Sequence, residues 1–263
     1  MPADSPFPTT CLESTDSTNL LARRAIESGE LDGTPGHFYI AARQTGGIGR
    51  QGRAWHSPAG GLWCSLAHPV ADGESPSAPE IANALGLRVG VACLTVIAEA
   101  LTRSMSPVMP MLKWPNDVLI KRRKVCGTLC EALVTPASAN APRTSWFIIG
   151  VGINVNNDVR ELPDDLRRAP IALRDLSDRD FDLTELASSL LRALLTAAST
   201  PGPDARTLSI ARERLYGKGA SINVVAPGGL HMPGMLVNLS DDGVPIIRTG
   251  EIEFVIPPGS ELV

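Results

Sequence analysis

The sequence contains no stretch of about 20 consecutive apolar residues, which is the length that a membrane-spanning helix requires. Its first residues, Met1 to Ser5, lack the basic start and the apolar segment of a secretory signal. A net charge of −4 and an isoelectric point near 5.6 argue against a general nucleic-acid-binding surface, which requires clustered Lys and Arg. These absences predict a cytoplasmic protein that binds no membrane and no DNA.

Common metal-binding and phosphate-binding motifs are also missing. Cys126 and Cys130 have the spacing of one helical turn, but no second Cys/His pair follows at the distance of a zinc site. The glycine-rich segments match neither a Walker A loop nor the dinucleotide motif G-x-G-x-x-G. The five cysteines are an odd number and lie mostly in apolar runs, which predicts reduced, buried thiols.

The length and composition predict two domains with a substantial core. With 263 residues the chain suits one large and one small domain, at about 100–200 residues for an ordinary domain. Apolar residues make up 43% and charged residues 20%, so global disorder is excluded. We place the larger domain at residues 1–214 and the smaller one at 215–263.

In the larger domain, apolar periodicity predicts alternating strands and helices after an extended surface segment at 1–13. The expected strands are 38–42, 60–67, 111–114, 118–120, 125–133 and 146–155, with a turn at 122–124. The expected helices begin after Ser17-Thr18-Asn19 and cover 80–103 and 183–198, with a further turn of helix within 210–215. In the smaller domain, short strands at 221–226, 234–239, 244–248 and 251–256 predict a small barrel of SH3 type.

The segment 44–55, QTGGIGRQGRAW, is the strongest local signal for a ligand. Its glycines let the backbone approach a bound molecule, and Arg50 and Arg53 offer planar donors to phosphate or carboxylate oxygens. Trp55 offers a flat surface on which a ring can stack. The segment is therefore either a loop that closes over an anionic ligand or a glycine-rich surface turn.

The segment Ser17-Thr18-Asn19 also allows two interpretations. These residue types are common helix N-caps, so their side chains could cap the helix that follows. Alternatively, they face a polar ligand at the helix start, where free backbone N–H groups add donors.

Five segments with specific residues occur in a fixed order: 17–19 (STN), 44–58 (QTGGIGRQGRAWHSP), 113–118 (KWPNDV), 123–131 (RKVCGTLCE) and 150–154 (GVGIN). Together they resemble the biotin–protein ligase family, also called biotin–[acetyl-CoA-carboxylase] ligases, across about residues 14–157. The resemblance implies an α+β fold. Its catalytic domain has the class II synthetase-like mixed sheet with flanking helices, and a small SH3-like barrel follows.

The resemblance further implies a two-step reaction with biotin, ATP and Mg²⁺. Biotin is activated as biotinyl-5′-AMP and then transferred to a lysine of the biotin carboxyl carrier domain of a carboxylase. Phosphoryl chemistry of this kind needs positioning and charge neutralisation more than a protein nucleophile. Accordingly, no Ser/His/Asp or Cys/His triad stands out in the sequence.

By the same resemblance, the catalytic residues are Lys124, Arg50 and Asp117, and Asp117 is also the candidate metal ligand. The residues implied for biotin are Ser17, Thr18, Asn19, Gln44, Gly47, Ile48, Gly49, Arg50, Lys124 and Gly127. Those implied for the nucleotide are Arg53, Trp55, Asn116 and Asn154. Structural alternatives remain for some: Trp55 and Trp114 as core residues, Lys124 in a solvated basic turn, and Asn154 as the cap of a strand.

Two features depart from the wider family. Position 48 is isoleucine where the family loop carries arginine, so we expect Arg50 and backbone N–H groups to contact the anion and Ile48 to pack on the biotin tail. Only 16 residues precede the Ser-Thr-Asn segment, fewer than a helix-turn-helix domain needs, so we expect no operator binding. A homodimer formed by strand pairing at a sheet edge is compatible with the resemblance.

Two other functions remain open at this point. A lipoate–protein ligase has a related catalytic domain, although its ligand lacks the ureido ring that Gln44 and the Ser-Thr-Asn segment would satisfy. A non-catalytic biotin-binding protein is the other alternative. Lys124, Arg50 and Asp117 argue against it, because binding alone needs no phosphate-handling charge.

Overall fold

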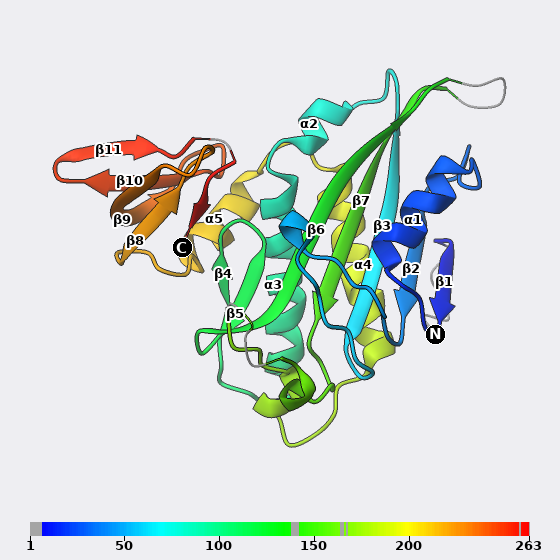
Figure 1. Ribbon diagram of the computed structural model, residues 1–263, viewed down its shortest axis with the longest axis horizontal. Coiled ribbons are helices and arrows are strands. Elements are labelled where there is room, and N and C mark those ends of the chain that lie inside the picture. The colour runs from blue at the N-terminus through cyan, green and yellow to red at the C-terminus, as the bar shows by residue number, and fades with distance from the viewer. Residues whose placement is uncertain (1–6, 138–141, 164–165, 167, 258, 263) are drawn as a thin grey trace.

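The computed structural model describes residues 7–137, 142–163, 166, 168–257 and 259–262. Within them the chain forms two sheets joined by helices (Figure 1). The larger sheet has seven strands in the order β1-β2-β3-β7-β6-β5-β4. Their bounds are β1 Thr9–Leu12, β2 His37–Ala41, β3 Leu62–Ala71, β4 Met111–Lys113, β5 Asp117–Ile120, β6 Arg123–Thr135 and β7 Thr144–Ile153.

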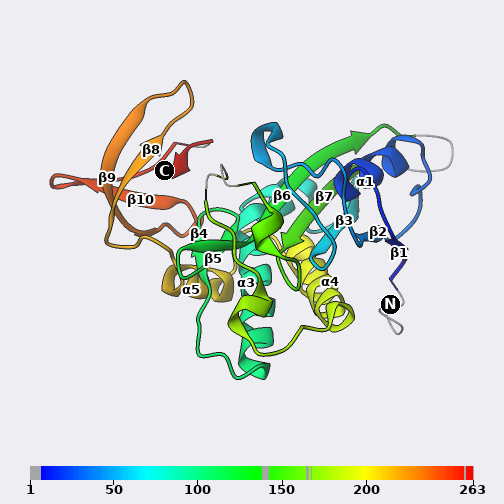
Figure 2. The same ribbon diagram turned by 60° about the horizontal axis from the view of Figure 1, so that its bottom comes forward.

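Helices cover both faces of this sheet, as the predicted fold class requires. α3 (Leu85–Arg103) and α4 (Leu183–Ser199) pack on one face, and α1 (Thr18–Glu27) lies on the other (Figure 2). Successive strand residues face opposite sides. In β7, for example, Ile149 packs in the α3 cluster whereas Ile148 packs in the α1 cluster.

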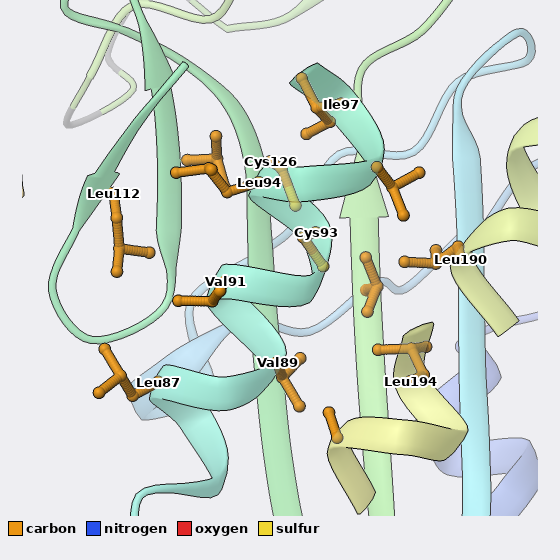
Figure 3. Packing of buried hydrophobic residues seen from close by; sticks show 14 of the residues in the cluster. Leu87, Val89, Val91, Cys93, Leu94, Ile97, Leu112, Cys126, Leu190 and Leu194 are labelled. Carbon is orange, nitrogen blue, oxygen red and sulfur yellow. The ribbon is translucent and has the colours of Figure 1, made fainter. Parts of the chain in front are cut away.

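The main core lies between the sheet and the two long helices. Apolar residues of α3, among them Leu94, Cys93 and Ile97, point toward the strands and α4 (Figure 3). α3 is, by length and composition, apolar enough to cross a membrane, and it is the only such helix among the described residues. Its burial between sheet and helix accounts for that composition.

The prediction of one helix over 80–103 was wrong. The chain forms α2 (Ala78–Ala82) and then α3, separated by Ala84 with φ +54°. The buried Arg88 stabilises the break, because its guanidinium donates to the carbonyls of Ile81 and Asn83, and also to Ala197 and Gly202. Burial lowers the pKa of Arg88 to about 10, so it remains charged at neutral pH. The apolar period continues across the break, which is why periodicity did not reveal it.

Three other local predictions needed correction. The segment expected to lie extended at the surface contributes β1, which pairs in parallel with β2. The turn expected at 122–124 is formed by Lys121 and Arg122, with φ of 48° and 66°, so Lys124 lies on strand β6. The expected turn of helix within 210–215 is part of α5 (Ala205–Glu213), whose N-terminus is capped by Asp204.

The second sheet is antiparallel, with the order β11-β10-β9-β8-β12. Its strands are β8 Ser221–Val225, β9 His231–Leu239, β10 Pro245–Thr249, β11 Ile252–Val255 and β12 Glu261–Leu262. This arrangement matches the expected SH3-like domain, with β12 added. Gly228 and Gly229 have positive φ, as the predicted hairpin turn requires. The domain boundary at 214/215 stays a prediction.

Candidate active site

Trp55 lies flat on the glycine-containing surface of β6 and β7. A Cβ atom at Gly152 would lie 2.4 Å from Trp55 Nε1, and one at Gly127 would lie 3.0 Å from Trp55 Cζ3. The indole edge also contacts Trp63, with ring centroids 6.4 Å apart. The two glycines are therefore needed because the ring approaches the backbone, not because of unusual dihedral angles.

Lys124 and Asp117 form an ion pair beside this indole. Lys124 Nζ lies 2.8 Å from Asp117 Oδ1 and 4.9 Å from the centroid of the Trp55 ring. The lysine side chain is 25% exposed and the aspartate 19%, so both stay within reach of a ligand while being partly shielded. A Cβ atom at Gly127 would lie 2.9 Å from Lys124 Nζ, so this glycine also makes room for the ammonium.

The glycine/arginine loop, residues 47–55, folds back on itself. Gly49 N donates to the Arg53 carbonyl at 2.7 Å and Trp55 N to the Gly47 carbonyl at 2.8 Å. Between them, residues 50–52 form one turn of 3-10 helix in which Gln51 has φ +59°. A Cβ atom at Gly47 would lie 2.3 Å from the Trp55 carbonyl oxygen, so glycine is required for this closure.

The two arginines of the loop have different positions. Arg50 is partly buried, and its Nη1 donates to Asn116 Oδ1 at 3.3 Å, which connects the loop to the turn between β4 and β5. Arg53 is exposed and donates to the Arg50 carbonyl and to Gln51 Oε1. The structure thus brings Arg50 to the other predicted residues and keeps these two bonds of Arg53 within the loop.

The Ser17-Thr18-Asn19 segment is buried, with exposures of 2%, 3% and 5%. The capping interpretation was wrong for the Ser17 side chain, because it makes no cap hydrogen bond. Instead Gln44 Oε1 accepts from the backbone N–H of Thr18 at 2.8 Å and lies 3.1 Å from its hydroxyl. Gln44 Nε2 donates to Ser57 Oγ at 2.7 Å, which connects the helix start to the segment that follows the loop.

Sequence reasoning missed two polar residues that bind this segment. Ser65, fully buried on β3, lies 2.7 Å from Thr18 Oγ1 and 2.6 Å from Asn19 Oδ1. Glu131 on β6 accepts from Asn19 Nδ2 at 2.8 Å. A serine inside an otherwise apolar strand was the available signal for Ser65. Glu131 belonged to the recognised segment 123–131 but had no assigned role.

Asn116 and Asn154 both form backbone contacts that hold the site together. Asn116 Nδ2 donates to the Thr128 carbonyl at 2.5 Å. Asn154 is 3% exposed, and its side chain lies between the Lys124 carbonyl and Asn157 Nδ2. The contact with the Lys124 carbonyl fits the alternative of Asn154 as a strand cap, and its contact with a nucleotide stays a prediction.

A cavity of about 550 Å³ adjoins these residues. Its walls include Arg50, Asn116, Trp114 and Glu131, so it opens beside both the loop and the β4–β5 turn. A second cavity, of about 410 Å³ between α3 and α5, is lined by none of the predicted site residues. Of these two cavities, only the first is lined by predicted site residues, namely Arg50 and Asn116.

The described residues contain no group of three or more His, Cys, Asp or Glu side chains arranged to hold a metal ion. Asp117 supplies a single carboxylate here. Mg²⁺ commonly binds through one or two carboxylates together with substrate phosphates. A role of Asp117 as a ligand of Mg²⁺ that arrives with a nucleotide stays a prediction.

Comparison with known proteins places this geometry in a family. The model of the Biotin/lipoate A/B protein ligase family matches residues 11–154. Among curated proteins, the chain is 29% identical to the biotin–[acetyl-CoA-carboxylase] ligase of Mycobacterium tuberculosis over 249 residues, covering 93% of this chain and 85% of that protein. It is 28% identical to the bifunctional ligase/repressor BirA of Bacillus subtilis over 244 residues, or 89% of this chain and 67% of that protein.

A solved structure agrees over nearly the whole chain. The biotin protein ligase of Aquifex aeolicus, in complex with biotin and ATP, superposes with a TM-score of 0.72 at 26% identity, covering 97% of this chain and 98% of that one. The fold of the chain is therefore that of a biotin protein ligase. The chain belongs to the Biotin/lipoate A/B protein ligase family, and the predicted enzyme class, a biotin ligase, is confirmed.

Proposed function

We propose that the protein activates biotin with MgATP as biotinyl-5′-AMP and transfers the biotinyl group to a lysine of a biotin carboxyl carrier domain. The observation that supports the proposal is the position of the Lys124 ammonium. It lies 2.8 Å from Asp117 and over the Trp55 ring, which itself packs on Gly127 and Gly152. A pure binding site would not need this partly shielded charge pair.

Lys124 supplies the charge that the first step requires. The biotin carboxylate attacks the α-phosphorus of ATP, a bond to pyrophosphate breaks, and negative charge accumulates on the phosphoryl oxygens. A preorganised ammonium stabilises that charge without reorganisation during the reaction. In this proposal Asp117 orients the ammonium, and Arg50 retains the adenylate from the loop side.

The buried polar end of the site suits the ureido ring of biotin, which has both donors and an acceptor. Ser17, Thr18, Asn19 and Gln44 lie at this end, and Gly47 closes the loop above them. In this proposal Ile48, Gly49 and Gly127 line the tail of biotin. Ile48 is 37% exposed, so its side chain is available to an apolar ligand.

The nucleotide is assigned to the Trp55 side of the site. Trp55 Nε1 is buried without a hydrogen-bond partner among the described residues, so the ring already sits against protein. We assign the adenine to the neighbourhood of Trp55 and Asn154, and the phosphates to Arg53 and Asn116. Asp117 is the carboxylate available to the Mg²⁺ that accompanies ATP.

The names of two relatives support the proposed acceptor. Two curated relatives, from Mycobacterium tuberculosis and Paracoccus denitrificans, are named biotin–[acetyl-CoA-carboxylase] ligases. A carrier domain of a carboxylase is therefore the acceptor that we propose here. The cytoplasmic location and the homodimer stay predictions.

Isotope exchange between ATP and pyrophosphate tests the first step. We expect exchange with biotin and little exchange with lipoate, because lipoate has no ureido ring. Exchange with lipoate alone would instead favour the lipoate ligase. Biotin binding without any exchange would favour the non-catalytic protein.

A further inference from the structure

A chain of hydrogen-bonding side chains connects Glu131 on β6, through Asn19 and Ser65, to Thr18 at the start of α1. We propose that Glu131 and Ser65 fix the direction of the hydrogen bonds at Thr18 and Gln44, so that this end of the site accepts N–H donors from its ligand. The inference rests on the proposed function and adds to it the property that selects the ligand.

The chain of hydrogen bonds begins at the ion pair between Arg23 on α1 and Glu131 on β6. Arg23 Nη2 donates to Glu131 Oε1 and Asn19 Nδ2 to Glu131 Oε2, both at 2.8 Å. A carboxylate can only accept hydrogen bonds. The Asn19 side chain therefore must turn its amide nitrogen to Glu131 and its oxygen to the other side.

The orientation of the Asn19 amide next determines the direction of the two hydrogen bonds of Ser65. Its hydroxyl lies 2.6 Å from Asn19 Oδ1 and 2.7 Å from Thr18 Oγ1. A hydroxyl has one proton, and Asn19 Oδ1 can only accept, so Ser65 donates to Asn19. The short contact between Ser65 and Thr18 then requires the Thr18 hydroxyl to donate to Ser65.

This assignment determines whether Thr18 and Gln44 present hydrogen-bond acceptors or donors to a ligand. The Thr18 proton has two candidate acceptors, Ser65 Oγ at 2.7 Å and Gln44 Oε1 at 3.1 Å, and the shorter contact takes it. Gln44 Oε1 is itself fixed as an acceptor by the Thr18 backbone N–H. Thr18 Oγ1 and Gln44 Oε1 thus form an adjacent pair of acceptors, which suits a ligand N–H and repels a ligand oxygen.

The variant Glu131→Gln keeps the size of the side chain but can present an NH₂ group to Asn19. Asn19 can then rotate its amide, Ser65 accepts instead of donating, and the Thr18 hydroxyl turns its proton toward Gln44 or the ligand. Biotin should be compared with an analogue in which a ring oxygen replaces one ureido N–H. We expect the affinity ratio of biotin to this analogue to fall about tenfold in Glu131→Gln, the size of one hydrogen bond.

Two further variants separate positioning from folding. Ser65→Ala interrupts the chain and should also lower the ratio. Glu27→Gln is the matched control, because Glu27 contacts the same Arg23 at 3.8 Å but has no contact with Asn19, and its ratio should equal that of the unchanged protein. A loss of stability alone would weaken both ligands equally and would overturn the proposal, as would an unchanged ratio in Glu131→Gln.

A second measurement does not depend on biotin. Neutron diffraction of the ligand-free protein should locate the Thr18 hydroxyl deuterium toward Ser65, and a position toward Gln44 would refute the inference. If the unchanged protein bound no biotin, the proposed function would fail while this measurement still decided the direction of the chain.

Discussion

Trp114 Nε1 donates a 2.9 Å hydrogen bond to the carbonyl oxygen of Gly243, and this bond connects the two sheets. Trp114 lies in the turn between β4 and β5, which includes Asn116 and leads directly into Asp117 on β5, and Gly243 lies in the hairpin turn between β9 and β10. Gly243 has φ +74°, and a Cβ atom there would lie 2.4 Å from Leu87 Cδ2. The second sheet therefore contacts the turn that precedes Asp117, so the two sheets are connected next to the candidate site.

The variant Trp114→Phe tests this connection. Phenylalanine retains an apolar ring but cannot donate, so we expect the free energy of unfolding to fall by about 1 kcal/mol. We also expect a higher KM for ATP with little change in biotin affinity, because the disturbed turn includes Asn116 and directly precedes Asp117. Urea unfolding and initial rates measure both quantities. An equal loss for both substrates would argue against a specific effect on the nucleotide side.

Gly152→Ala should displace Trp55, because the new methyl group would overlap the indole. Overpacking of this kind costs about 1–3 kcal/mol. At about 1.4 kcal/mol per factor of ten, nucleotide affinity should fall about 5- to 140-fold. Isothermal titration and tryptophan fluorescence provide the measurement.

The matched stability control is Gly86→Ala in α3, where an added Cβ atom has no neighbour within 4 Å. This variant should keep or raise stability by about 0.5–1 kcal/mol, since alanine favours a helix over glycine. Unchanged nucleotide affinity in Gly152→Ala would mean that the position of Trp55 is unimportant for the ligand.

Ile48→Arg restores the arginine that the wider family carries in the loop. Because position 48 is 37% exposed and lies next to Gly47 and Gly49, a guanidinium there can reach an anionic ligand. We expect slower release of the adenylate, measured by rapid filtration after single-turnover synthesis. If affinities for biotin and ATP and the release rate all stayed the same, position 48 would have no part in ligand contact.

His68 makes stability depend on pH. Its Nδ1 atom is buried without a partner among the described residues, and burial lowers the pKa of His68, opposed by a smaller effect of Glu74. The unfolded chain, with a pKa near 6.5, therefore takes up the proton first, so stability falls as pH decreases through 6.5 toward the folded-state value.

Urea unfolding at pH 8 and pH 5.5 measures this effect. His68→Gln cannot take up the proton and should show a smaller loss between the two pH values. Burial also lowers the pKa of His37, so part of the dependence should remain in the variant. An identical pH dependence in the variant and the unchanged protein would contradict the role of His68.

The sequence predicted the strands of the central sheet well, because each carries a distinct apolar run. It missed β1, because Thr9–Leu12 contains only two apolar residues, Cys11 and Leu12, and its partner strand β2 lies far along the chain. It missed the break at Ala84, which depends on a charged side chain, Arg88, reaching distant carbonyls. Both features arise from contacts between segments far apart in the chain, which local patterns do not contain.

The same dependence on contacts between distant segments explains which site residues the sequence revealed and which it did not. Trp55, Lys124, Asp117 and Gly127 lie together, and their segments were recognisable by residue type and order. Ser65 and Glu131 became visible only when the sheet brought three segments beside the start of α1.

Variants of the Lys124–Asp117 ion pair test the proposed role of the ammonium in adenylate formation. Lys124→Met removes the ammonium and leaves Asp117 unpaired, so it alone could also weaken the fold. The double variant Lys124→Met, Asp117→Asn removes the unpaired carboxylate and separates the two effects. Both should lower the rate of adenylate formation by about 100-fold or more, the typical loss of an electrostatic stabiliser.

Mass spectrometry of a carrier-domain lysine, after incubation with biotin, MgATP and either the unchanged protein or the double variant, tests the central claim most directly. We predict a mass increase of one biotinyl group with the unchanged protein and almost none with the double variant over the same time. An unmodified carrier with the unchanged protein, or equal modification by both, would contradict the account.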